Sequence, residues 1–318
     1  MIKEVLELPE LREQPPVLVD VGASGALHPA WKEIAPYSIC IAFDADAREM
    51  THVRNAPGSF RELFVYNRIV SDGPAGQERF YLTKSPFCSS RLRPNHTELR
   101  NWAFADSFEL VNETTLPTTQ VAEILKELKL QRIDWLKIDS QGTDLRLFRN
   151  IPEPIRHKIL NVEFEPGIIN AYQGEDLLAD VLRHMGSEPF WASKLNVRGN
   201  VRMSQEVYKT LSPFKQRHIP RYLPIAPAWV EINYTNNFQN PELNKRDFLL
   251  GWVFSTLLAQ HGFALQLAQE GQKRFGDSSF DRLRDRSLAA FSRAYTRHPL
   301  YFFKQLVKLL LRWEKRKN

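Results

Sequence analysis

The sequence has few cysteines and no long apolar run. Cys40 and Cys88 are the only thiols among 318 residues, too few for a disulfide framework or a zinc-binding spacing. No run approaches the ~20 apolar residues that cross a bilayer. The first residues, MIKEVLELPELREQ, mix acids and bases without the apolar core of a secretory signal. These absences predict a protein of a reducing compartment, and we expect it to be cytoplasmic.

Histidine is also scarce and scattered. The eight histidines show no metal-ligand spacing and no Cys/His cluster, and carboxylates that would suit Mg²⁺ lack a dedicated motif. We therefore predict no metal. The chain shows no fixed-period repeat and no low-complexity linker, which argues against a solenoid.

The positive charge is concentrated at one end of the chain. Of the net charge of +6, residues 300–318 supply +5 through six basic side chains and one acidic, which leaves +1 for the remainder. We therefore expect no nucleic-acid partner for the main domain. The last segment fits two interpretations, a basic amphipathic helix in peripheral contact with the inner membrane face or a terminal helix packed on its neighbours. Its regularly spaced basic residues are Lys304, Lys308, Arg312 and Lys315.

Short β-branched or aromatic runs alternate with helix-like stretches over the first 200 residues, a pattern typical of βαβ units and a mostly parallel sheet. The predicted strands are 17–21, 38–43, 63–70, 108–112, 133–138 and 159–164, and the predicted helices are 29–35, 47–55, 120–128, 143–150 and 176–185. A proline-rich region of loops and edge strand, 201–240, follows. Residues 241–318 form a predicted helical extension, with helices 248–258, 263–275, 280–297 and 300–315.

The segment DVGASGA, residues 20–26, predicts a ligand-binding turn after the first strand. Gly22 and Gly25 allow backbone conformations and close ligand approach that larger side chains would prevent, and Ala23 and Ser24 keep the turn narrow. At the end of the second strand, Asp44, followed by Ala45, is placed to accept hydrogen bonds from the two hydroxyls of a ribose, with Asp46 as a second candidate. A nicotinamide dinucleotide would use the same architecture, although the G-x-G-x-x-G spacing is absent.

The motifs, in their order and spacing, resemble the FkbM-type class I S-adenosylmethionine-dependent methyltransferases over roughly residues 17–195. They are DVGASGA, AFDADA, NRIVSDGPAGQERFYLT, SPFCSS, RIDWLKIDSQGTDLRLFRNI and ILNVEFEP. The resemblance implies a Rossmann-like α/β sheet with S-adenosylmethionine as cofactor. It places Asp20, with Gly22 and Gly25, near the methionine portion, Asp44 at the ribose, and Ser71 and Asp72 beside the adenine.

The resemblance further implies O-methylation of a hydroxyl on a sugar, a glycan or a secondary metabolite. The chain departs from the family pattern at Ala26, where a third glycine is usual, and at Gln141, where a glutamate is common. Two alternatives remain open. One is a binding or assembly protein on a methyltransferase scaffold that has lost catalysis, and the other is a nicotinamide-dependent oxidoreductase.

Four charged residues near the ends of two strands are candidates for the chemistry. Period-2 alternation places Lys137 and Asp139 on one side of the strand in WLKIDSQG, and Glu163 and Glu165 likewise share a side of the next strand. If the strands are neighbours, the Lys137 amine meets a carboxylate of Glu163 or Glu165 beside the acceptor hydroxyl. The alternative is a purely structural ion pair that closes the top of the sheet.

Overall fold

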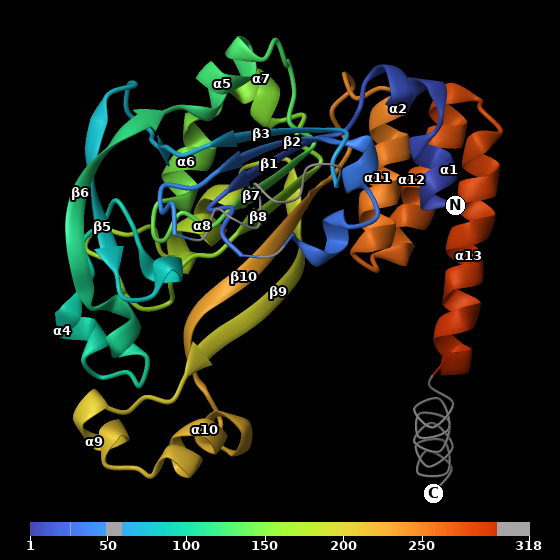
Figure 1. The fold of residues 1–318 in the computed structure, drawn as a ribbon. Helices are drawn as coiled ribbons and strands as arrows, with labels where there is room; N and C mark the ends of the chain where they lie inside the picture. The colour runs from blue at the N-terminus through green and yellow to red at the C-terminus, as the bar shows by residue number, and fades with distance from the viewer. Residues whose placement is uncertain (26, 49–58, 298–318) are drawn as a thin grey trace, which may run out of the picture. The chain divides into compact units, whose positions relative to one another are not determined.

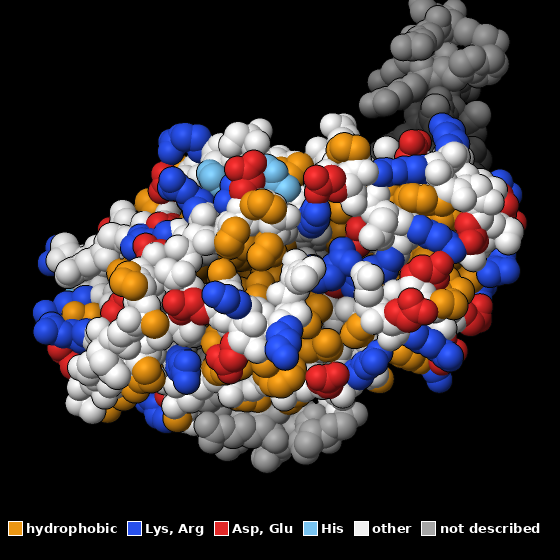
Figure 2. All heavy atoms as spheres, turned by 90° about the horizontal axis from the view of Figure 1, so that it is seen from above, with side chains coloured by type: hydrophobic (Ala, Val, Ile, Leu, Met, Phe, Trp, Pro, Cys, Tyr) orange, Lys and Arg blue, Asp and Glu red, His pale blue; other side chains and the backbone are white. Residues whose placement is uncertain are grey.

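The computed structural model describes residues 1–25, 27–48 and 59–297. The chain divides into two compact units, of which the first spans Met1–Leu243 and the second begins at Asn244. Over the face seen in Figure 2, acidic and basic side chains are interspersed with hydrophobic ones, so neither sign of charge dominates it.

Among the described residues, seven strands form the central sheet of the first unit (Figure 1). In spatial order they are β3 (Glu62–Tyr66), β2 (Ile39–Phe43), β1 (Val17–Val21), β7 (Trp135–Ile138), β8 (Asn161–Phe164), β10 (Ala226–Asn236) and β9 (Phe190–Asn200). The first five are parallel, whereas β10 is antiparallel to both β8 and β9. The chain order reverses between β1 and β7, and ligands of open α/β sheets bind beyond the carboxyl ends of the strands at such a point.

The predicted α/β class and Rossmann-like sheet are confirmed, and the antiparallel hairpin β9–β10 is the departure from the six-stranded dinucleotide-binding order. β2, ICIAF, is buried at every position, as expected for a strand of a parallel sheet covered on both faces. One face packs on the helices α5 (Val121–Glu127), α6 (Asp144–Asn150) and α8 (Leu178–Met185), which share its apolar core. All three helices were predicted within two residues of their observed bounds.

The shorter helices of this unit are α1 (Ile2–Leu6), α2 (Pro9–Glu13), α4 (His96–Leu99) and α7 (Glu153–Arg156). The predicted helix 29–35 is instead two 3₁₀ turns, Pro29–Trp31 and Ala35–Tyr37. Pro29 and Pro36 enclose too few residues for a stable α-helix, and such short pieces adopt 3₁₀ geometry. The predicted helix 47–55 falls largely outside the described residues.

A second, smaller sheet corrects two predicted strands. It contains β4 (Ile69–Val70), β6 (Leu110–Thr119) and β5 (Gln77–Thr83), in that spatial order. The predicted strand 63–70 is therefore divided, because Asn67 and Arg68 separate β3 in the central sheet from β4 in the small one. The predicted strand 108–112 is the beginning of the longer β6, which pairs with β5 rather than with the central sheet.

The region predicted as loops and edge strand, 201–240, is more ordered than its prolines suggested. Two helices, α9 (Gln205–Lys209) and α10 (Pro213–Tyr222), connect β9 to β10. Pro213 occupies the first turn of α10, where its missing N–H removes no helical hydrogen bond. β10 lies inside the central sheet, and β9 is the edge strand.

The second unit is helical, as predicted. It contains α11 (Lys245–Leu257), α12 (His261–Phe275) and α13 (Ser279–Arg297). Asn244 and Asp247 form a capping box at the start of α11, and Gly276 ends α12 in the left-handed conformation. The predicted helix 300–315 lies outside the described residues, so its membrane contact stays a prediction. None of the described helices combines the length and the apolarity that a bilayer span requires.

Candidate functional site

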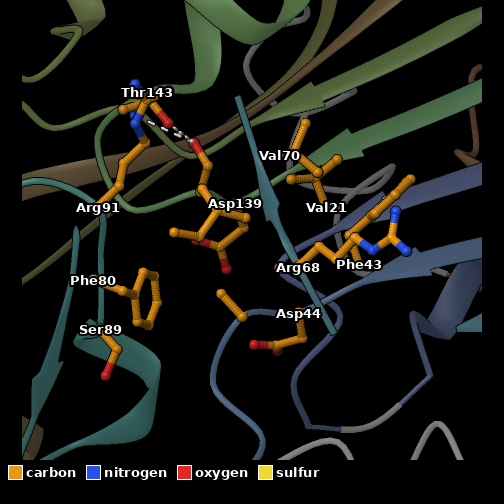
Figure 3. A pocket seen from close by; sticks show the side chains of 14 residues that line it. Val21, Phe43, Asp44, Arg68, Val70, Phe80, Ser89, Arg91, Asp139 and Thr143 are labelled. Carbon is orange, nitrogen blue, oxygen red and sulfur yellow. Dashed lines mark hydrogen bonds between the residues drawn. The ribbon is translucent and has the colours of Figure 1, made fainter. Parts of the chain in front are cut away.

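Two pockets meet at the carboxyl ends of the parallel strands, and Asp139 lines both of them. The first pocket lies between the ends of β1 and β2 and the small sheet. Figure 3 shows Phe80 and Ser89 on one side of it and Phe43 and Arg68 on the other, with Asp44 and Asp139 between them. Its other lining residues are Val21, Gly22, Ala45, Ile69, Val70, Arg91, Ser140 and Thr143.

Gly22 forms the floor of the first pocket, where the turn after β1 contacts the end of β7. Its φ is +82°, and a Cβ there would lie 2.0 Å from the carbonyl oxygen of Asp139. Only glycine tolerates both conditions. The Gly22 and Ala23 N–H groups both donate to the Phe43 carbonyl at 2.9 Å, which joins the turn to the end of β2. The turn predicted from DVGASGA is therefore present where a ligand can approach its backbone.

The two aspartates after β2 have different environments. The carboxylate of Asp46 binds the Arg48 guanidinium, which also donates to the Thr83 carbonyl and the Ser89 hydroxyl. Asp44 lines the pocket instead, and the one hydrogen bond to its Oδ1 from the residues that the structure describes is local, from the Asp46 N–H at 2.8 Å. Burial raises the pKa of Asp44 to about 7 despite that hydrogen bond. Asp44, rather than Asp46, is the acid available to a ligand.

The other residues predicted to bind the cofactor differ in whether they line the first pocket. Ala45 lines it beside Asp44. Gly25 has φ +79°, and a Cβ there would be 3.5 Å from the Phe87 ring, so the end of the turn faces the second pocket. Ala23 is buried, and Ser24, between Ala23 and Gly25, is half-buried. Gly22 thus lines the first pocket, and Gly25 lies beside Phe87, which lines the second.

Ser71 and Asp72 lie just beyond the pocket wall that Ile69 and Val70 form. The Ser71 hydroxyl donates to Glu78 at 2.6 Å, and Asp72 pairs with Arg91 at 2.7 Å. Arg91 itself lines the pocket. Burial would raise the pKa of Asp72, but the hydrogen bond and charge of Arg91 outweigh it and lower that pKa. Glu78 also pairs with Arg91, at 2.9 Å, so Asp72 holds Arg91 directly and Ser71 does so through Glu78. The adenine side remains a prediction for these residues.

Lys137 contradicts the predicted contact with Glu163 or Glu165. Its Nζ lies 3.0 Å from Oδ1 of Asp20, which is its register partner on β1. Burial disfavours the ammonium, but the charges of Asp20 and Asp139 outweigh it and raise the pKa of Lys137. Lys137 thus stays charged, and Asp20 is engaged with it rather than lining either pocket.

Strand order explains this correction. β7 lies between β1 and β8, so Lys137 has Asp20 on one side and Glu163 on the other. Glu163 accepts a hydrogen bond from Trp135 Nε1 at 2.8 Å and lies 3.3 Å from His28 Nε2. Glu163 therefore belongs to a structural cluster on the sheet face, outside both pockets.

The second pocket has a volume of about 350 Å³ and is lined by the other two predicted catalytic acids, Asp139 and Glu165. These acids follow the ends of the neighbouring strands β7 and β8, and in this pocket the charge of Asp139 acts on Glu165. Burial, reinforced by the charge of Asp139, raises the pKa of Glu165 to about 9. Burial also raises the pKa of Asp139, against the effects of Lys137 and of a hydrogen bond from Gln141. Two acids in one cleft with raised pKa values are typical of a catalytic site.

Sequence reasoning missed the residues that support this acid pair. Gln141, with φ +57°, donates through Nε2 to Asp139 and accepts from the Tyr172 hydroxyl at 2.8 Å. Asp144 accepts hydrogen bonds from the Ser140 N–H and the Glu165 N–H, at 3.0 and 2.8 Å. Asp144 therefore ties the end of β7 to the end of β8. The positive φ required within SQGT was the one local signal for this turn.

The aromatic walls of the second pocket were also missed, because they come from segments far apart in the sequence. They are Phe87, Phe104, Phe108, Tyr172 and Trp229. Glu175 completes the polar lining. Burial raises its pKa to about 8, although it accepts a hydrogen bond from the Tyr172 N–H. A Cβ at Gly167 would collide with the Glu175 carboxyl group, so that glycine makes room for the acid.

The chain has a family match that covers most of both pockets. Residues 51–189 match the family described as Methyltransferase FkbM domain. This region contains the small sheet, Asp139, Glu165 and Tyr172, whereas the turn at Gly22 and the acid Asp44 precede it. No curated protein and no solved structure matches the chain. The match confirms the resemblance to the FkbM-type methyltransferase family over residues 51–189.

Proposed function

We propose that the protein is an S-adenosylmethionine-dependent O-methyltransferase that acts on a hydroxyl of a sugar or a similar polyhydroxylated compound. The observation that carries this proposal is the position of Asp139 on the wall shared by the two pockets. In the proposal the first pocket holds the cofactor and the second holds the acceptor. A carboxylate at their boundary is then within reach of the atom that receives the methyl group.

The first pocket fits the cofactor by its shape and its charge. Gly22 exposes the backbone after β1, and Asp44 offers a carboxylate that two vicinal ribose hydroxyls can satisfy. Asp20 and Asp139 are close enough to Asp44 to raise its pKa further. A group of carboxylates suits a sulfonium cation. It suits the pyrophosphate of a nicotinamide dinucleotide less well, and this argues against the oxidoreductase alternative.

The chemistry needs a base and a fixed alignment. Bound S-adenosylmethionine would supply a methyl group attached to a positively charged sulfur. Asp139 would accept the proton of the acceptor hydroxyl, and its raised pKa makes it a stronger base than an exposed carboxylate. Glu165 keeps its proton near neutral pH, and the Gln141 side chain positions Asp139 by donating a hydrogen bond to it. Alignment of the hydroxyl in the pocket supplies much of the remaining rate.

The second pocket supports a ring-shaped acceptor with several hydroxyls. Its aromatic side chains can cover the apolar face of such a ring, while Glu165, Glu175 and Tyr172 offer polar groups to its hydroxyls. Gln141, which departs from the family's glutamate, donates a hydrogen bond to Asp139 and adds no charge beside it. This supports turnover over the alternative of a binding protein that has lost catalysis.

Ligand-induced stabilisation separates the three functions. At ~100 times its Kd, S-adenosylhomocysteine should stabilise the protein by ~2.7 kcal/mol, a rise in Tm of about 5 to 10 °C, whereas NAD should leave Tm unchanged. Differential scanning fluorimetry measures both. Stabilisation by NAD alone would contradict the proposal. Stabilisation by S-adenosylhomocysteine without methyl transfer to any sugar or glycan acceptor would favour the binding protein.

The affinity for S-adenosylhomocysteine should depend on pH through Asp44. Its pKa of about 7 means that the carboxylate, which accepts the ribose hydrogen bonds, forms as pH rises through neutrality. If the charged form binds, the Kd should fall about tenfold from pH 6 to pH 8. Isothermal titration calorimetry at several pH values measures this, with Asp44→Asn as the control. The variant should bind more weakly and without the pH dependence, and a dependence that survives the substitution would exclude Asp44 as its source.

A further inference from the structure

The helical segment between β9 and β10, residues 201–225, carries apolar side chains on its outside. We call this segment the arm, and Figure 1 shows its helices α9 and α10 at the far end of the two strands. Phe214 and Tyr222 on α10 are 73% and 78% exposed, and Val207, Leu223 and Ile225 are also exposed. Contiguous apolar side chains in water mark a surface that binds a partner.

The interior of the arm is held together by polar contacts, and its exposed apolar side chains therefore remain available to contact a partner. The Tyr208 hydroxyl donates to the Gln216 carbonyl at 3.0 Å, and the Gln216 side chain donates to the Tyr208 and Leu211 carbonyls. On the outside of α10, the Phe214 and His218 rings lie 4.4 Å apart and the His218 and Tyr222 rings 6.2 Å apart. These residues, four apart along the helix, form one aromatic stripe.

The charge of the arm identifies the kind of partner. Residues 201–225 contain five basic residues and one acidic, a net charge of +4, although the body outside the last segment is nearly neutral. Lys215 and Arg217 are exposed beside the aromatic stripe, and neither pairs with an acid within the part of the chain that the structure describes. Lys209 instead binds Asp106 and fastens α9 to the rest of the unit. Basic residues that flank exposed aromatic and aliphatic side chains are typical of an interfacial helix on anionic lipid.

We propose that the arm docks on the surface of an anionic lipid bilayer. Phe214, Tyr222 and Leu223 enter the interface between headgroups and acyl chains, while Lys215 and Arg217 contact lipid phosphates. The exposed aliphatic residues of the arm favour lipid over single-stranded nucleic acid, since bases stack on aromatic rings and not on Leu223 or Ile225.

The arm rises from the rim of the second pocket. Two residues of β10 just after it, Ala228 and Trp229, line that pocket, and Trp229 is bridged to Gly167. Docking would therefore place the mouth of the pocket near the membrane surface and select an acceptor attached to lipid. This last step rests on the proposed function, whereas membrane binding itself does not.

Vesicle co-sedimentation of the full chain tests the arm without any methyl transfer. Binding is expected to vesicles containing one quarter phosphatidylglycerol and not to pure phosphatidylcholine, and 0.5 M NaCl should weaken it. Each basic residue near an anionic surface strengthens partitioning about fivefold. Lys215→Glu with Arg217→Glu should therefore lower the partition coefficient about 25-fold or more. Phe214→Ser with Tyr222→Ser should lower it at least tenfold, at unchanged Tm.

Matched substitutions in the last segment separate the two basic regions of the chain. If the last segment packs on its neighbours, Lys308→Glu with Arg312→Glu should leave the partition coefficient within about twofold. If it also contacts the membrane, both arm variants should still lower binding. Loss of binding in this variant together with full binding of both arm variants would overturn the proposal. Sedimentation equilibrium gives a second readout. If the aromatic substitutions convert a dimer to a monomer, the exposed apolar residues of the arm bind a second copy of the chain. This result would also overturn the proposal.

Discussion

Asp139→Asn should reduce kcat about 10³-fold, the usual contribution of a general base, while the Kd for S-adenosylhomocysteine stays within a few-fold. Asparagine keeps the size of the side chain and its place between the two pockets. It cannot take the proton of the acceptor hydroxyl. Single-turnover methyl transfer from labelled S-adenosylmethionine measures the chemical step, and calorimetry measures the affinity.

Glu163→Gln is the matched control for Asp139→Asn. Glu163 follows the same alternation on the neighbouring strand, but it contacts Trp135 and His28 and lines neither pocket. Its variant should retain kcat within about threefold, as expected for a residue outside the chemistry. Full activity of Asp139→Asn would remove Asp139 from the mechanism, and an equal loss in both variants would point to general damage of the sheet.

Gly22→Ala should destabilise the first unit by about 3 kcal/mol or more and abolish cofactor binding. The left-handed conformation costs an alanine ~1 to 2 kcal/mol. In addition, its Cβ would lie 2.0 Å from the Asp139 carbonyl, which forces a backbone shift at the point where both pockets meet. The corresponding fall in Tm is about 6 to 12 °C, measured by differential scanning calorimetry with and without S-adenosylhomocysteine.

Gly174→Ala separates backbone strain from collision. Gly174 has φ +73°, yet an added Cβ would meet nothing within 4 Å. It should cost only the strain, about 1 kcal/mol or somewhat more, and keep cofactor-induced stabilisation. Equal destabilisation by the two alanines would show that the contact between Gly22 and the end of β7 is unimportant.

Local patterns in the sequence were sufficient for the elements that bury a regular apolar face. β1, β2, β7 and β8 were predicted within two residues of their observed bounds because each is a short apolar run bounded by proline, glycine or polar residues. The small sheet was not predicted, since its strands alternate weakly and, among the described residues, form ladders only with one another. The helical unit followed from helical periodicity and capping residues.

The candidate site was predictable where it depends on one turn and not where it depends on strand order. Gly22, Asp44 and Asp139 were predicted at strand ends from the glycine turn, from spacing and from alternation, and all three line the first pocket. The partner of Lys137 was wrong, because the sequence does not say that β7 lies between β1 and β8 and that Asp20 faces it. The walls of the second pocket come from five separate segments, and local spacing contains no information on such an assembly.

Arg48 joins the two halves of the site in a way that bears on the order of binding. Its guanidinium bridges Asp46, two residues after Asp44, and Ser89, which adjoins Phe87 and Cys88 of the second pocket. A ligand held beside Asp46 would therefore also act, through Arg48, on the segment that lines the second pocket. In the proposed reaction, this bridge would favour entry of the methyl donor before the acceptor.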